Sequence, residues 1–167
     1  MLPEYQHHLP ADFAPESRVW IYQSSRLFFI SEAFQIEDML NEFVANWLSH
    51  GAQVKGYANL FFGSFIIIMA DEVSTDVSGC STDSSVRLIK DIEQQFKVNM
   101  FDRQNLAFYI KEKIQLLPLN QLDYAIKNKF IQKDTLYFNN TVQTKQQLEN
   151  EWIIPVEESW LAKRYIF

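Results

Sequence analysis

The sequence predicts an α+β protein built on a ferredoxin-like βαββαβ sandwich. Through residue 110 the expected elements run strand, helix, strand, strand, helix, strand, which is the order of that fold. The stretch from Phe65 to Ala70 is apolar at every position, as in a strand that is covered on both faces. Helices cover only one face of a ferredoxin-like sheet. We therefore expect a C-terminal α/β extension to cover the sheet's other face, with a dimer partner as the alternative.

Local sequence signals mark the individual elements. Apolar residues recur at steps of three and four between Phe34 and Leu48, which predicts one face of an amphipathic helix. Gly63-Ser64 separates two apolar runs and is typical of a hairpin. Thr144 with Gln147 fits the capping box at a helix start. The expected elements are strand 17–22, helix 32–49, strands 53–62 and 65–70, helix 82–97, strands 105–110 and 114–117, helix 121–129, strand 135–138 and helix 145–152.

The chain divides into three expected parts. Its 167 residues suit one domain with an appendage. Residues 1–16 carry three prolines and predict an irregular N-terminal arm. Residues 17–111 form the predicted ferredoxin-like core. Residues 112–167 form the extension that we expect to pack on that core.

Charge and cysteine content limit the classes of function. The net charge of -6 disfavours nucleic acid and anionic membranes, because both favour dense Lys and Arg. We therefore expect neither as a partner. The single cysteine and the lack of a basic-then-apolar export signal predict a cytoplasmic location. The longest nearly apolar stretch, 60–70, is too short to span a bilayer.

The polar segment from residue 71 to residue 85 is the expected functional site. If the first and third strands are parallel neighbours, their ends bring Ser24 and Arg26 beside the start of the second helix. Free backbone N–H groups there, together with a guanidinium, would hold an anion. Simple capping of the helix by its hydroxyl and carboxylate side chains is the competing interpretation. The ligand-binding residues predicted here are Ser24, Arg26, Gly79, Cys80, Ser81, Asp83 and Ser84.

An enzyme at the same segment is the rival hypothesis. Cys80 precedes a helix, where a thiolate is favoured, and Asp71, Asp76 and Asp83 could supply carboxylates. A nucleophile also needs a base, and His50, the only histidine outside the arm, is expected far from Cys80. The first hypothesis is therefore non-catalytic binding of a small, possibly anionic, ligand or a protein partner. A purely structural partner protein is the third. Under each hypothesis we expect a monomer or a homodimer.

Several familiar motifs are absent from the sequence. It contains no phosphate loop ending in Gly-Lys-Ser/Thr, no GxGxxG, no HExxH, no GxSxG and no paired CxxC. The acidic segment does not match the spacing of a calcium loop. We therefore expect no cofactor and no metal site.

Four features of the sequence together resemble a family of small, uncharacterised bacterial proteins. They are Gly79-Cys80-Ser81-Thr82-Asp83-Ser84-Ser85-Val86; Phe138-Asn139-Asn140 with Thr144; Trp152 with Pro155; and Ser159-Trp160. The resemblance runs from about Val19 to Trp160. Members are sometimes labelled ABC-transporter ATPases, an activity that requires the missing phosphate loop, so we do not expect it here. The resemblance implies no catalytic residues.

Overall fold

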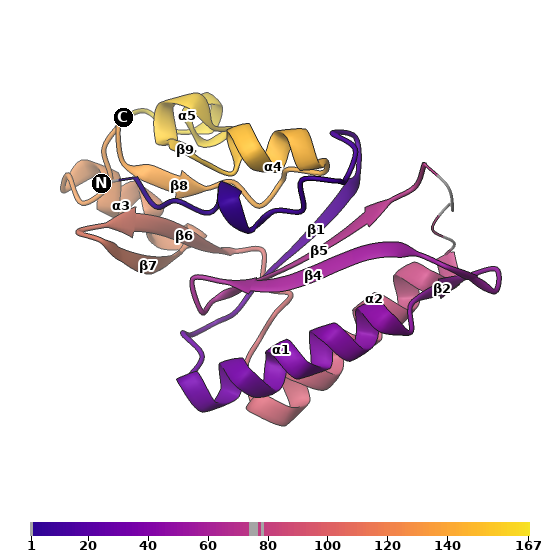
Figure 1. Ribbon diagram of the computed structural model, residues 1–167. Coiled ribbons are helices and arrows are strands. Elements are labelled where there is room, and N and C mark those ends of the chain that lie inside the picture. The colour runs from indigo at the N-terminus through magenta and orange to yellow at the C-terminus, as the bar shows by residue number, and fades with distance from the viewer. Residues whose placement is uncertain (1, 74–76, 78) are drawn as a thin grey trace.

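The protein has an α+β fold, as predicted, with antiparallel sheets and a pair of long helices (Figure 1). The structure is a computed structural model that describes residues 2–73, 77 and 79–167, without the side chain of Cys80. The helices and strands are β1 (Arg18–Gln23), α1 (Ile30–Ala45), β2 (Leu48–Ser49), β3 (Ala52–Gln53), β4 (Lys55–Phe61), β5 (Phe65–Asp71), α2 (Gly79–Phe96), β6 (Asn105–Ile110), β7 (Lys113–Pro118), α3 (Leu122–Lys127), β8 (Leu136–Phe138), α4 (Lys145–Glu151), β9 (Ile153–Pro155) and α5 (Leu161–Arg164).

The first sheet has the strand order β1-β5-β4, and β5 runs antiparallel to both neighbours. Arg18 pairs with Ala70, and Gln23 pairs with Phe65. The prediction that the first and third strands are parallel is therefore wrong. The tight turn after β4 reverses the chain into β5, whereas α1 carries the chain from β1 back to a parallel β4. In consequence, the end of β1 lies beside the start of β5.

The predicted fourth strand, β6, belongs to a second sheet with the order β7-β6-β8-β9. It forms a hairpin with β7 through Lys111 and Glu112, which have φ angles of 52° and 60°. Two left-handed residues are typical of a two-residue hairpin turn. The predicted boundary between residues 111 and 112 thus falls inside this turn. Among the described residues the first sheet has three strands, so the complete ferredoxin-like arrangement is not seen there.

Helices α1 and α2 cover one face of the first sheet (Figure 1). Side chains from alternate positions of β5, namely Ile66, Ile68 and Ala70, point into this layer and are fully buried. They pack against Ile36 and Leu40 of α1 and against three α2 residues. Those α2 residues are Ile89, Ile92 and Phe96.

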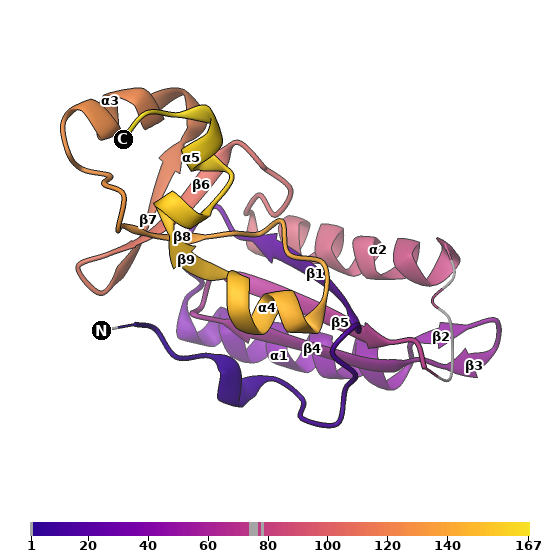
Figure 2. The same cartoon turned by 90° about the horizontal axis from the view of Figure 1, so that it is seen from above.

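The opposite face of the same sheet is covered from both ends of the chain. The other positions of β5, namely Phe65, Ile67 and Met69, pack here. The N-terminal arm and the region from β8 to α4 lie over this face in Figure 2. The residues that supply the cover are Tyr5, Leu9 and Phe13 from the arm, Ala107 from β6, and Phe138, Val142, Leu148 and Trp152. The uninterrupted apolar sequence of β5 follows from this two-sided burial.

Candidate functional site

The structure does not bring the two predicted groups of site residues together. Arg26 lies at the C-terminal end of α2, where its Nη2 donates to the backbone oxygen of Phe96 at 2.8 Å. Gly79 begins the same helix. The helix has 18 residues, and at 1.5 Å per residue it is roughly 26 Å long. Ser24 stays with Arg26, because its backbone N–H donates to Ser64 at the far end of the sheet.

The first turn of α2 is occupied with structural contacts. Ser81 is buried, its hydroxyl donates to the backbone oxygen of Leu48, and its own backbone oxygen accepts the indole N–H of Trp47 at 3.0 Å. Asp83 is exposed. Ser84 borders a shallow surface groove between α1 and α2. Asp76 lies outside the described residues, as does the side chain of Cys80.

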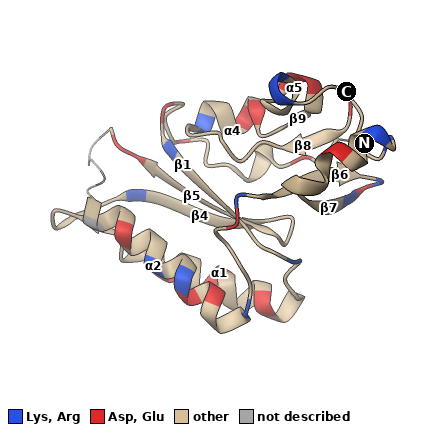
Figure 3. Ribbon diagram, turned by 180° about the vertical axis from the view of Figure 1, so that it is seen from behind, with Lys and Arg blue, Asp and Glu red and all other residues tan. Residues whose placement is uncertain are grey.

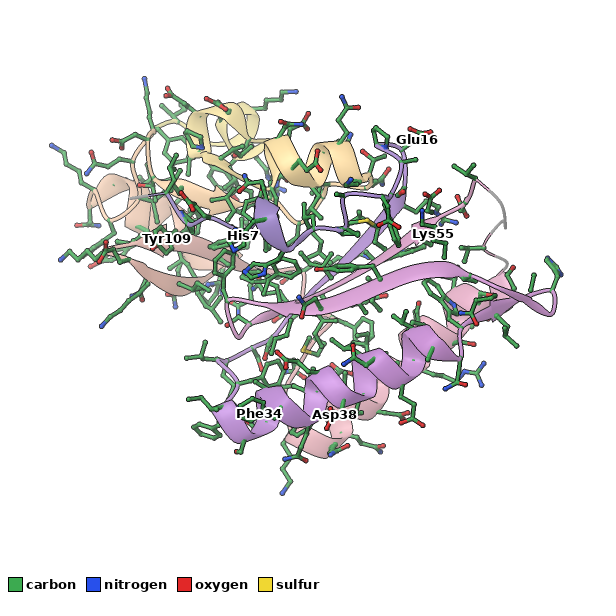
Figure 4. All side chains as sticks on the ribbon, viewed as in Figure 1. His7, Glu16, Phe34, Asp38, Lys55 and Tyr109 are labelled. Carbon is green, nitrogen blue, oxygen red and sulfur yellow. The ribbon has the colours of Figure 1, made fainter. Side chains whose placement is uncertain are left out.

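Asp71 ties the N-terminal arm to the sheet. Its carboxylate accepts the backbone N–H groups of Ala14 and Val73, each at 3.1 Å, and lies 3.5 Å from Nζ of Lys55. Burial by itself opposes ionisation, but these hydrogen bonds and Lys55 outweigh it and lower the pKa of Asp71. Figure 4 shows Lys55 on the side of β4 where the arm passes. Among the described residues, no three His, Cys, Asp or Glu side chains come together as metal ligands.

A cavity of about 470 Å³ lies between the outer edge of β1 and the second sheet. We call it the inter-sheet cleft. Its walls come from β1, the 100–107 segment, the end of β8 and the 140–143 loop, with Trp160 from the C-terminal region. Charged residues gather on helices and loops, whereas the middle of the first sheet carries none (Figure 3). The cleft is lined mainly by aliphatic, aromatic and amide side chains, with Asp102 and Arg103 as its charged residues.

A chain of amide hydrogen bonds crosses one end of the inter-sheet cleft. Gln23 Nε2 donates to the backbone oxygen of Asn105 at 2.8 Å, and Asn140 Nδ2 donates to Gln23 Oε1 at 2.9 Å. The indole N–H of Trp152 donates to Asn140 Oδ1 at 3.0 Å. The side chains of Gln23 and Asn140 are thereby fixed in position. This network joins the first sheet to the second.

Aromatic side chains line two walls of the cleft. Tyr22 meets Phe101 edge to face, with ring centroids 5.5 Å apart. Burial raises the pKa of Tyr22, against the opposing effects of a hydrogen bond with Ser85 and of the charge on Arg103. On the other wall, the indole N–H of Trp160 donates to the hydroxyl of Tyr137 at 3.1 Å. Burial also raises the pKa of Tyr137, despite that hydrogen bond.

Sequence reasoning missed the inter-sheet cleft. From the sequence, Gln23 follows the strand expected at 17–22 and is expected, with Arg26, beside the 71–85 segment. Asn140 enters only as part of a family resemblance. Phe101 and Arg103 lie in the connection between α2 and β6, whose sequence has no periodicity typical of a helix or a strand. The one usable signal was the polar pair at 139–140 directly after an apolar strand, since a buried amide needs partners.

Comparisons with models of protein families, with curated proteins and with solved structures find no match. The resemblance to a bacterial family remains a prediction. Among the described residues, no helix has both the length and the apolar character needed to cross a membrane.

Proposed function

We propose that the protein is a non-catalytic binding protein that holds a small ligand in the inter-sheet cleft. The observation that carries this proposal is the cleft itself, whose volume of about 470 Å³ lies within the ordinary range of ligand sites. Its lining also has the usual composition of such sites, in which apolar and aromatic walls carry a few fixed polar groups. The proposed class of function, non-catalytic binding, is the one expected from the sequence. The proposed site is the inter-sheet cleft instead of the 71–85 segment.

The chemistry of the lining favours binding over catalysis. Among the described residues that line the cleft, Asp102 is the only carboxylate, and none is a cysteine or a histidine. General acid–base and nucleophilic catalysis usually need such groups within hydrogen-bond reach of each other. The fixed amides of Gln23 and Asn140 instead suit recognition of a polar group on the ligand. Asp102 and Arg103, both exposed at the rim, carry opposite charges, so the lining does not select a ligand by its net charge.

Tryptophan fluorescence and NMR test this proposal. Trp20 and Trp160 line the cleft, so an occupant should change the emission of the protein. The probes are indole, phenol and benzoate, titrated against ¹⁵N-labelled protein. We expect saturable shifts confined to the cleft residues.

A matched pair of variants locates the binding. Gln23→Ala removes the amide that bridges Asn105 and Asn140 and should weaken the binding of the probes. Gln115→Ala removes an exposed amide from β7 and should leave it unchanged. Equal effects of the two substitutions, or the absence of shifts at millimolar concentrations of all three probes, would contradict the proposal.

A further inference from the structure

We infer that the group recognised in the inter-sheet cleft is an extended peptide backbone, which adds as a strand to the outer edge of β1. This inference rests on the proposed function and specifies its ligand. It follows from the hydrogen-bonding groups that β1 leaves open, from how the chain protects the rest of that edge, and from the walls on either side.

The outer edge of β1 is covered by the protein's own chain at both ends. Near its start, the backbone N–H of Val19 donates to Gln143 at 2.9 Å, and that of Lys145 donates to Ser17 at 2.9 Å. Just past its end, the backbone N–H of Ser25 donates to Asn99 at 2.9 Å. Such covering is how proteins keep an edge strand from pairing at random. Between these two covered ends, the middle of the outer edge of β1 has no covering strand among the described residues; we call this stretch the gap.

Ile21 and Gln23 occupy that gap. In an antiparallel pair, alternate residues direct their backbone groups toward the partner strand and away from it. The outward bond of Val19 therefore places the N–H and C=O of Ile21 and of Gln23 on the same outer edge. These groups form no backbone hydrogen bonds with described residues. They offer alternating donors and acceptors, which is the feature that an added peptide strand recognises.

The opposite wall of the cleft has a stretch of β6 with no paired strand among the described residues, although the side chain of Gln23 already donates to the backbone oxygen of Asn105 at one end of it. Strand β8 pairs with β6 only at Phe108 and Tyr109. The first half of β6, from Asn105 to Ala107, borders the cleft without a paired strand on that side. Between the covered ends, and at about 3.3 Å per residue, the gap accepts a segment of about four residues.

The side walls favour alternating apolar side chains on the guest. Successive residues of an extended peptide point to opposite sides. Toward the helix layer they would meet Tyr22 and Phe101, and toward the other face they would meet Phe138 and Val142. Asp102 and Arg103 at the rim offset each other, so the cleft selects no net charge.

The test uses the blocked tetrapeptide acetyl-Val-Thr-Val-Thr-amide and an analogue with alternate amide nitrogens methylated. Methylation removes the backbone donors and keeps the side chains. We expect the parent peptide to shift the amide signals of Ile21 and Gln23 in the ¹⁵N-labelled protein. The analogue should bind at least about tenfold more weakly, because it loses two hydrogen bonds.

Two substitutions at one position provide the matched control in the protein. Ile21→Pro removes the outward N–H without taking a bond from the β1–β5 ladder, and proline is tolerated at such edge positions. Ile21→Ala removes a comparable amount of side chain and keeps the N–H. The alanine variant should bind the peptide nearly as well as the unaltered protein, and the proline variant several-fold less.

The outcomes separate this inference from the proposed function. If the aromatic probes occupy the cleft and the peptide does not, the proposed function holds and the inference is wrong. Equal binding of the peptide and its methylated analogue also overturns the inference. If neither peptide nor aromatic probe binds, both proposals fail. If Ile21→Pro does not fold, the affinities of the parent peptide and of its methylated analogue for the unaltered protein decide whether the inference holds.

Discussion

The guanidinium of Arg26 holds the carboxylate of Glu32 through two hydrogen bonds, of 2.8 and 2.9 Å. The same guanidinium donates to the backbone oxygen of Phe96 at the end of α2, and Glu32 accepts the backbone N–H of Phe29 just before α1. One ion pair thus joins the start of one helix to the end of the other. Each charge also lies at the helix end whose dipole favours it.

The first prediction concerns Glu32 and pH. The hydrogen bond from Arg26 is the largest cause that lowers the pKa of Glu32 from 4.5 to about 2. A lowered pKa stabilises the folded state above about pH 4.5, and this contribution is lost as the pH falls toward 2. Because the pair is partly exposed, Glu32→Gln should lower the free energy of unfolding by about 1 kcal/mol at pH 7. Urea unfolding of the unaltered protein and of the variant at several pH values measures this difference in the free energy of unfolding.

The control for this prediction is Glu37→Gln, an exposed position on the same helix. It should change the free energy of unfolding little at any pH. The difference between the unaltered protein and Glu32→Gln should shrink between pH 4.5 and pH 2. A difference that stays constant over this range would show that the charge of Glu32 does not contribute.

The second prediction concerns Asp71. Asp71→Asn puts an amide where a buried carboxylate accepts two backbone N–H groups. We expect a loss of about 1–3 kcal/mol in the free energy of unfolding, together with faster proteolytic cleavage of the arm. Asp12→Asn is the matched control, because Asp12 faces the same Lys55 from an exposed position. Equal effects of the two substitutions would contradict a special role for Asp71.

The third prediction concerns Gly56 in β4. A Cβ atom at this position would lie 2.6 Å from Cε3 of the Trp47 ring, and Trp47 is buried. Gly56→Ala should therefore cost about 1–3 kcal/mol through overpacking. At Gly79 a Cβ atom meets nothing within 4 Å, so Gly79→Ala should be nearly neutral. Thermal unfolding of both variants tests the contrast, and a neutral Gly56→Ala would mean that the ring moves aside easily.

The fourth prediction concerns a fragment that ends at Lys111. It lacks Phe138, Leu148 and Trp152, which cover one face of β5. The face that loses this cover and keeps mainly the N-terminal arm is that of Phe65, Ile67 and Met69, whereas Ile66 and Ile68 stay under the helices. We expect the fragment to aggregate in size-exclusion chromatography and to bind a hydrophobic dye. A monomeric fragment that unfolds cooperatively would show that the C-terminal region is dispensable for this layer.

Much of the secondary structure could be predicted from the sequence, because its signals are local. The periodic apolar positions of α1 predicted a helix at 32–49, and the structure has it at Ile30–Ala45. It ends early because Trp47 leaves the helix to pack beneath β4 and bond to Ser81. The capping role of Thr144 is confirmed, since its hydroxyl accepts the backbone N–H of Gln147.

Strand direction and sheet membership could not be predicted in the same way. The apolar run of β5 indicates burial on both faces, but it does not predict which strand pairs with β5 or in which direction. The order of elements suggested that β6 would close the first sheet, yet β6 pairs with β7 and β8. The expected site assumed parallel β1 and β5, whereas the two strands are antiparallel, so Arg26 was placed at the wrong end of α2. The inter-sheet cleft has a different origin: because β6 pairs in the second sheet, it leaves part of the β1 edge open.

The two-sided burial of β5 also bears on how the protein is made. A ribosome releases β5 long before it has synthesised Trp152, which packs against Phe65. At synthesis rates of about 5–20 residues per second, the delay is roughly 4–16 s. Throughout that interval the nascent chain displays an apolar strand face with only the N-terminal arm to shield it. Holding chaperones that bind such segments would therefore meet this protein during translation, before its last third exists.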